Sequence, residues 1–199
     1  MPLRAGAARG HVDVTRIIAG AGRGRKLAVP AGRDTRPTSD RVREALFSSV
    51  ESQLGPLAGL RVIDLYAGSG ALGLEALSRG AAHVLLVEFD ARAVRVIQTN
   101  IAALGLPGAA VVPASVERTL RDPPGQRYGL VLADPPYPTS GDEITAVLSR
   151  LCEGWLLPEA VVIVERPSRA TPLLWPDCLI GTGHRRYGET MLWYGRPAR

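Results

Sequence analysis

The tetrapeptide Asp134-Pro135-Pro136-Tyr137 contains the residue types best suited to chemistry on an amine. It directly follows an apolar run at residues 128–133, which predicts a buried strand. Two prolines fix φ near about −65° and remove two N–H donors, so the turn is stiff and presents carbonyl groups. The Asp134 carboxylate and the Pro135 carbonyl can accept both hydrogens of an exocyclic –NH2, which leaves the nitrogen lone pair free to attack. Tyr137 offers a flat face on which a base can stack.

A plain turn, with its tyrosine packed in the core, would also suit these four residues, so a second site must decide. Residues 60–66 predict a buried strand that leads into a glycine-rich turn and a helix. In doubly wound sheets such a turn, at a helix N-terminus, binds nucleotide-like ligands. Gly68, Gly70 and Gly73 match the dinucleotide pattern G-x-G-x-x-G, although that match alone is a weak signal.

Asp64 separates the two ligands that this turn could bind. A carboxylate at the end of the strand would repel a pyrophosphate and attract a sulfonium or ammonium centre. S-adenosylmethionine carries both cations and no phosphate, so the sequence favours it over NAD. The residues expected to bind it here are Asp64, Tyr66, Ala67, Gly68, Ser69 and Gly70.

Two later strand ends are expected to complete the cofactor site. Glu88 closes the apolar run at residues 83–88, at the position where an acid accepts hydrogen bonds from ribose hydroxyls. Phe89 either flanks the adenine or belongs to the core. Ala114 and Ser115 follow the third strand and offer backbone groups and one hydroxyl to the adenine.

The segments Asp64-Leu-Tyr-Ala-Gly-Ser-Gly70 and Asp134-Pro-Pro-Tyr137 resemble the amino-group branch of class I S-adenosylmethionine-dependent methyltransferases. More narrowly, residues 16–20, 23–27 and 36–47 resemble the RsmD family, and the resemblance extends to residues 187–190. It implies S-adenosylmethionine as cofactor and transfer of a methyl group to N2 of one guanine in 16S ribosomal RNA, either free or in the assembling 30S subunit. Relatives often carry a polar acid or amide where this chain has Ala114 and Ser115.

Positive charge is concentrated in the N-terminal quarter of the chain. Residues 1–43 contain ten Lys and Arg against three Asp and Glu, whereas the remaining residues contain fourteen against sixteen. A basic block of this kind fits contact with a polyanion. The residues expected to contact nucleic acid are Arg16, Arg23, Arg25, Lys26, Arg33, Arg36, Arg41 and Arg43.

Alternating strands and helices predict an α/β fold: a doubly wound, mostly parallel, seven-stranded Rossmann-like sheet with a small N-terminal β-hairpin. We expect a basic tail at residues 1–14, a hairpin extension for RNA contact at 15–37 and the methyltransferase domain at 38–199. Thr38 or Ser39 is expected to cap a helix, which by resemblance closes over cofactor and base. Strands are expected at 60–66, 83–89, 109–112, 128–133 and 159–165, with helices at 70–79, 91–104, 115–121 and 142–152, then a closing hairpin near 178–195.

Several partners and compartments are not expected. Cys152 and Cys178 are too few and too far apart in sequence for a metal site, so we expect buried, unpaired cysteines in a reducing compartment. His11, His83 and His184 show no ligand spacing. No run has the length of a membrane helix, and no apolar signal core begins the chain. We therefore expect a cytoplasmic monomer with neither metal nor membrane partner.

Three other functions fit parts of the sequence. An amino-methyltransferase acting on DNA bases would use the same Asp-Pro-Pro-Tyr turn, and only the N-terminal resemblance favours RNA. An NAD-dependent oxidoreductase fits the glycine pattern but leaves Asp64 and the two prolines without a role. A non-catalytic RNA-binding module would need the basic segment but none of the catalytic groups.

Overall fold

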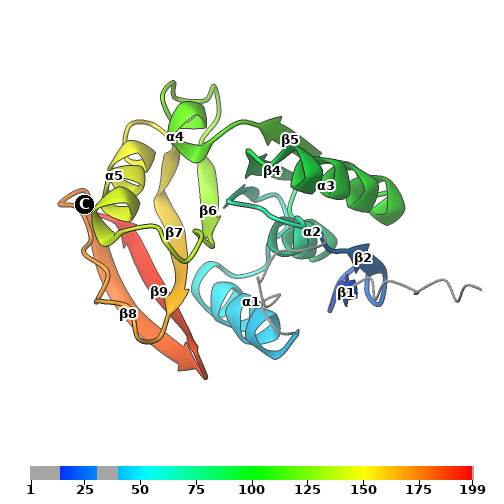
Figure 1. Ribbon diagram of the computed structural model, residues 1–199, viewed down its shortest axis with the longest axis horizontal. Helices are drawn as coiled ribbons and strands as arrows, with labels where there is room; N and C mark the ends of the chain where they lie inside the picture. The colour runs from blue at the N-terminus through cyan, green and yellow to red at the C-terminus, as the bar shows by residue number, and fades with distance from the viewer. Residues whose placement is uncertain (1–13, 31–39, 199) are drawn as a thin grey trace, which may run out of the picture.

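The computed structural model describes residues 14–30 and 40–198, which build one large sheet with helices on both faces (Figure 1). The strand order in this sheet is β5-β4-β3-β6-β7-β9-β8. The strands are β3 (Arg61–Leu65), β4 (His83–Glu88), β5 (Ala109–Pro113), β6 (Tyr128–Ala133), β7 (Leu156–Pro167), β8 (Leu179–Tyr187) and β9 (Thr190–Pro197). The strands from β5 to β7 run parallel, and β9 is antiparallel to both β7 and β8. The predicted mostly parallel sheet and closing hairpin are confirmed.

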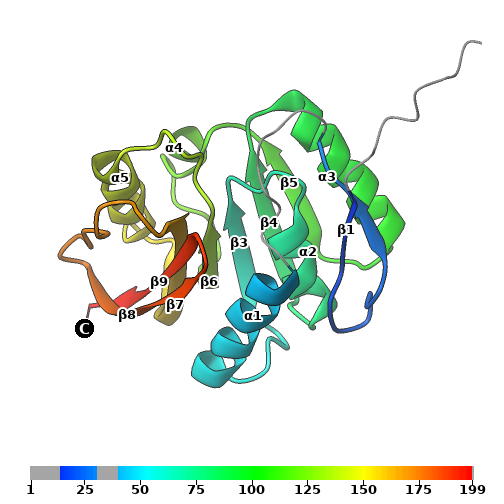
Figure 2. The same ribbon diagram turned by 60° about the horizontal axis from the view of Figure 1, so that its bottom comes forward.

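The helices divide between the two faces because successive residues of a strand point to opposite sides (Figure 2). Leu130 and Leu132 of β6 join the core under α1 (Asp40–Leu54), α2 (Ala71–Ser78) and α3 (Ala91–Leu104). Val131 and Ala133 join the opposite core under α4 (Val116–Thr119) and α5 (Gly141–Leu151). A strand covered on both faces needs apolar residues at every position, which explains the continuous apolar run at residues 128–133.

The N-terminal hairpin, β1 (Val14–Arg16) and β2 (Lys26–Ala28), packs against α2 and α3 and shares their core. Ile17 and Leu27 are fully buried there. The buried carboxylate of Glu75 in α2 accepts hydrogen bonds from the N–H groups of Ile18 and Ala19, at 2.7 and 3.0 Å. The hairpin is therefore attached through its own backbone as well as through apolar contacts.

Asn100 of α3 connects the same hairpin to the glycine turn. Its side-chain amide donates to the carbonyls of Ala28 and Ser69, both at 2.9 Å, while its oxygen accepts from the N–H of Ala28. Asn100 is itself buried, and its three hydrogen bonds are partly buried. The position of β2 and the position of the turn at Ser69 are thus set by one side chain.

The expectation about the cysteines needs correction, and the expectations about the helix cap and the tail concern residues that the structure does not describe. Cys152 at the end of α5 and Cys178 before β8 form a disulfide, so they are not unpaired as predicted. The fold brings their Cα atoms to 6.3 Å, a proximity that their 26-residue separation in sequence does not reveal. The caps proposed at Thr38 and Ser39, like the tail over residues 1–13, lie outside the described residues. Among described residues, no helix combines the length and apolarity needed to cross a membrane.

Candidate active site

The carboxyl ends of the parallel strands bring the two predicted sites to one edge of the sheet. Leu65 at the end of β3 pairs with Val87 on one side and with Ala133 on the other. The residues that follow these strands, Tyr66 and Asp134, are therefore neighbours at the same edge, where doubly wound sheets bind their ligands. Sequence order separates these segments, and only the strand order makes them adjacent.

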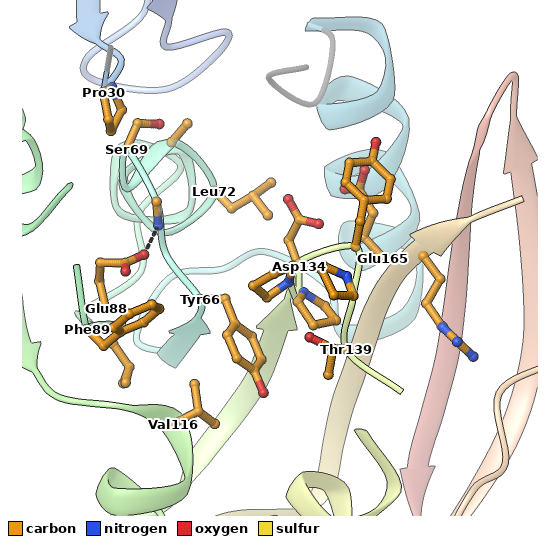
Figure 3. A pocket seen from close by; sticks show the side chains of 18 of the residues that line it. Pro30, Tyr66, Ser69, Leu72, Glu88, Phe89, Val116, Asp134, Thr139 and Glu165 are labelled. Atoms are coloured by element: carbon orange, nitrogen blue, oxygen red, sulfur yellow. Dashed lines mark hydrogen bonds between the residues drawn. The ribbon is translucent and has the colours of Figure 1, made fainter. Parts of the chain in front are cut away.

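A cleft of about 570 Å³ lies at this edge and is lined by both segments (Figure 3). In this view Asp134 lies at the centre, between Leu72 and Glu165. Predicted site residues lining the cleft are Tyr66, Gly68, Ser69, Glu88, Phe89, Ala114, Ser115, Asp134, Pro135, Pro136 and Tyr137. A base held at Asp134 and a cofactor held at the glycine turn would thus share one cavity.

The Asp-Pro-Pro-Tyr turn presents its polar and aromatic groups to solvent within this cleft. Asp134 follows β6 directly and is exposed, and the Tyr137 side chain is 69% exposed. A tyrosine that filled the core would be buried, so the structure contradicts the plain-turn alternative. The exposed ring leaves a face available for a planar ligand.

Asp64 does not line the cleft, contrary to the expectation that it faces the cofactor. Its side chain is 1% exposed and accepts a hydrogen bond of 2.8 Å from the N–H of Gly73 in α2. Burial, with a smaller contribution from the charge of Glu88, raises the pKa of Asp64 to about 7. The physical reason for this position is that the side chain turns under the glycine turn, where it accepts from the N–H of Gly73 and holds the first turns of α2.

Gly73 permits this close approach. A Cβ atom at this position would lie within 3.1 Å of side-chain atoms of Val84, Leu86 and Asp64. The third glycine of the pattern therefore serves helix–sheet packing. Ala67 and Gly70, also predicted to bind the cofactor, are buried and do not line the cleft; Ala67 donates its N–H to the Val87 carbonyl, and Gly70 precedes α2 with a left-handed φ of 79°.

Glu88 lines the cleft and also supports the turn. Its carboxylate accepts from the N–H groups of Gly68 and Asp90, at 2.9 and 2.8 Å, and the first of these bonds is drawn in Figure 3. Carboxylate oxygens have further lone pairs, so a ribose hydroxyl can still donate to Glu88. Phe89 next to it is 63% exposed and lines the cleft, which excludes a core position for this ring.

Tyr66 has an unusual backbone conformation at the end of β3. Its φ is 62°, and it is the one non-glycine residue with positive φ among residues 14–30 and 40–198. Such conformations are costly outside glycine and concentrate at functional sites. Burial, with the nearby charges of Glu117 and Glu143, raises the pKa of the Tyr66 hydroxyl, so it stays protonated at neutral pH.

The predicted nucleic-acid contacts other than Arg43 divide into three groups. Arg16, Arg23, Lys26 and Arg41 are exposed, and Arg16 pairs with Asp40 at 2.8 Å. Arg25 donates to the carbonyls of Ala103 and Leu104 at the end of α3, which gives it a structural role as well. Arg33 and Arg36 lie outside the described residues.

Arg43, predicted to contact nucleic acid, is buried beside the cleft. It is 1% exposed and lines the cleft from α1. Its Nη2 donates to Thr15 Oγ1, to the Arg16 carbonyl and to Asp40 Oδ1, each at 2.8 Å. Residues two positions apart on a helix lie on different faces, so Arg43 points inward from α1 whereas Arg41 faces solvent.

The sequence did not indicate all residues that line the cleft. The cleft is also lined by Leu72, Val116, Glu117, Glu143, Glu165 and Thr190. Glu165 occupies the end of the strand next to β6, so the rule that ligands bind at carboxyl ends of strands would have identified it. Glu143 and Thr190 carry no comparable signal, because they come from a helix and from a hairpin. Within the described part of the chain, no three His, Cys, Asp or Glu side chains are grouped to hold a metal ion.

Comparison with known proteins finds similarity to methyltransferases along nearly the whole chain. A family model described as conserved hypothetical protein 95 matches residues 15–196. The Escherichia coli (strain K12) protein named ribosomal RNA small subunit methyltransferase D is 42% identical over 151 residues, which is 75% of this chain and 73% of that protein. Its Haemophilus influenzae namesake is 37% identical over 174 residues, covering 85% of this chain and 86% of that one.

A solved structure supports the arrangement of the elements. The Escherichia coli protein yhhF superposes with a TM-score of 0.79 at 35% sequence identity, covering 94% of this chain and 100% of that structure. The match covers nearly the whole chain, so the described architecture is shared with this solved relative.

Proposed function

Because the chain belongs to the conserved hypothetical protein 95 family, which is the RsmD family of ribosomal RNA small subunit methyltransferases, we propose that it methylates ribosomal RNA. We further propose that the acceptor is the exocyclic N2 amine of a guanine in 16S ribosomal RNA and that S-adenosylmethionine is the methyl donor. The 16S RNA would be methylated in the cytoplasm, either as free RNA or within the assembling small subunit.

The observation that supports this proposal is the shared cleft of the glycine turn and the Asp-Pro-Pro-Tyr turn. The cleft also suits the donor: the exposed ring of Phe89 can flank an adenine, and Glu88 can accept from a ribose. When bound, S-adenosylmethionine supplies a methyl group made electrophilic by a sulfonium.

The residues at the end of β6 would then prepare the amine. The Asp134 carboxylate and the Pro135 carbonyl would accept the two N2 hydrogens, which favours a pyramidal nitrogen whose lone pair is free to attack. Tyr137 stacks on the guanine after the base has left its own stack. Holding the nitrogen in line with the methyl group makes the contribution of these residues chiefly one of positioning. The proton of the methylated amine leaves to Asp134 or to water.

Replacing Asp134 tests this function. In Asp134→Ala the amine loses its principal acceptor, so we expect turnover to fall by at least about 100-fold. Cofactor affinity, measured by calorimetry with S-adenosylhomocysteine, should stay unchanged because Asp134 contacts only the acceptor. Turnover is measured by mass spectrometry of nucleosides from purified small subunits, with duplex DNA as the alternative substrate.

The control is Asp142→Ala, an exposed carboxylate in the first turn of α5 that does not line the cleft. It should leave turnover unchanged. Equal loss of turnover and cofactor affinity in Asp134→Ala would refute the assigned role. Methylation of DNA, or of an RNA base other than guanine, would refute the proposed substrate.

A further inference from the structure

Arg43 has hydrogen-bonding capacity that the fold does not use. All three of its hydrogen bonds to described residues use Nη2, while Nε and Nη1 are buried and have no partner. Buried donors of a charged group are costly when unpaired, and such groups in native structures call for an explanation. The side chain lines the cleft, so a ligand there is the natural source of the missing acceptors.

The other charges of the cleft restrict what that ligand group can be. Of the described residues, six carboxylates line it: Glu88, Glu117, Asp134, Glu143, Glu165 and Glu189. Among the described residues lining the cleft, the only other cation is Arg166, whose Nη1 donates to the Thr171 carbonyl. An acidic wall of this kind attracts cations and repels anions. An anionic group can therefore be accommodated only close to an arginine.

S-adenosylmethionine carries one anionic group, the α-carboxylate of its methionine part, beside its sulfonium and ammonium cations. Its adenosine is expected near Phe89 and Glu88, and its methyl group must reach Asp134. The methionine end then falls toward the wall formed by the N-terminal hairpin and α1. Thr15, Val29 and Pro30 contribute to that wall, and Figure 3 shows Pro30 beside Ser69 of the glycine turn.

We propose that Arg43 binds the α-carboxylate of the methyl donor, an inference that rests on the proposed function. Thr15 Oγ1 and Asp40 hold Nη2, so the guanidinium is fixed before the ligand arrives. Arginine suits this task because its planar fork matches a carboxylate and stays charged when buried. Arg43 is therefore assigned to cofactor binding and not to the RNA surface.

Binding of two ligands that differ only in the carboxylate tests this assignment. The ligands are S-adenosylhomocysteine and its decarboxylated analogue, titrated calorimetrically into the full-length protein. Wild-type protein should bind the first about 10- to 100-fold more tightly, the range expected for a charge-assisted hydrogen-bonded pair. Arg43→Gln should lower the affinity for S-adenosylhomocysteine to that of the analogue, without changing affinity for the analogue.

The matched control is Arg41→Gln, which removes an exposed arginine from the same helix and should keep the wild-type discrimination. Arg43→Lys keeps the charge but not the planar fork, so it should retain part of the wild-type preference for S-adenosylhomocysteine over the decarboxylated analogue. If Arg43→Gln does not give the thermal unfolding transition of a folded protein, Arg43→Lys and the wild type still test the assignment. Equal discrimination by these two proteins would overturn it.

Other outcomes also decide the matter. Equal weakening of both ligands by Arg43→Gln would make Arg43 a structural residue only. Unchanged cofactor binding with weakened RNA binding would make an RNA group its ligand, and either result overturns the proposal. Wild-type protein that binds neither ligand would instead refute the proposed function, which keeps the two failures distinguishable.

Discussion

At the scale of single residues, the glycine turn depends on a buried carboxyl group that does not line the cleft. Asp64 is buried beneath the turn, and its Oδ2 accepts from Gly73 in the first turns of α2. A protonated carboxyl keeps that acceptor and loses the cost of a buried charge. The turn that forms one wall of the cleft therefore becomes sensitive to pH through a residue behind it.

This placement predicts a pH dependence of stability. The pKa of Asp64 is about 7 in the folded protein and 3.8 in the unfolded chain, so the folded state binds the proton more tightly. The stabilisation is complete below the unfolded pKa and is lost as pH rises through about 7. In Asp64→Asn this loss is absent, so its free energy of unfolding should fall less than that of wild type between pH 4 and 7. The difference in slope should reach about 1.4 kcal/mol per pH unit.

Urea unfolding at a series of pH values measures that slope. Asp142→Asn, at an exposed position on α5, is the control and should follow the wild-type curve. Parallel curves for Asp64→Asn and wild type would show that Asp64 titrates normally.

At the scale of elements, the N-terminal hairpin is positioned by α2 and α3 and in turn forms part of the cleft. Glu75 accepts from two hairpin N–H groups and from Arg79 Nε at 2.8 Å. Arg79 also pairs with Glu44 and Glu51 of α1, at 3.0 and 3.2 Å, and lies over the ring of Phe47. One ionic network, buried at Glu75 and Arg79 and half-exposed at Glu44 and Glu51, thus connects the hairpin, α1 and α2.

Replacing Glu75 should loosen the hairpin before it affects the sheet. In Glu75→Gln one oxygen becomes an NH2 group that faces a backbone donor, and Arg79 loses its buried counter-charge. Breaking a buried pair in this way costs about 3–5 kcal/mol. Amide hydrogen exchange should accelerate at Ile18 and Ala19 more than in β3 or β6.

The matched control for this element is Glu44→Gln, which removes a half-exposed partner of the same arginine. It should have little effect, because exposed pairs contribute about 0–1 kcal/mol. Uniform acceleration over the whole chain in Glu75→Gln would show that the hairpin does not open separately.

At the scale of the whole molecule, the disulfide between Cys152 and Cys178 closes a 26-residue segment that contains β7. Cross-links of this kind stabilise mainly by restricting the unfolded chain, by about 2–4 kcal/mol. Cys152→Ser should lower the unfolding temperature, and reductant should lower that of wild type to a similar value.

Alkylation of the unfolded, unreduced protein followed by mass spectrometry reports the pairing directly. The double variant Cys152→Ser, Cys178→Ser is the control and should not respond to reductant. Two alkylated cysteines in the unreduced wild type would contradict the pairing and would restore the expectation from sequence.

The charge of the whole molecule predicts how RNA binding depends on salt. Arg23 and Lys26 are exposed on the hairpin, whereas Arg25 is partly engaged by carbonyls of α3. The variants that test this contact are therefore the charge reversals Arg23→Glu and Lys26→Glu, and Arg25 is left unchanged. Each RNA phosphate that these side chains no longer neutralise should reduce the slope of log affinity against log salt by about 0.7–0.9.

The control is Arg127→Glu, exposed just before β6 and therefore at the sheet edge opposite Asp134. It should leave the slope close to that of wild type. An unchanged slope after both hairpin reversals would remove this hairpin surface from the RNA interface.

Periodicity and turn chemistry were enough to predict the elements of the fold. Strands buried on both faces are continuous apolar runs, and each ends at a short polar or glycine-containing segment, so the alternation and most boundaries could be found from sequence. The same reasoning placed the Asp-Pro-Pro-Tyr turn at the ligand-binding edge, because residues that directly follow such strands lie there. It left Phe89 open between the adenine site and the core.

Side-chain direction and long-range pairing required the tertiary structure. Asp64 and Arg43 have the residue types expected at a charged ligand, yet one turns beneath the glycine turn and the other turns from α1 into the cleft. Cys152 and Cys178 meet only because the fold brings the end of α5 next to the segment before β8. Local sequence determines where a strand or helix begins and ends, whereas the packing of distant elements decides which side chains are removed from water and which meet the ligand.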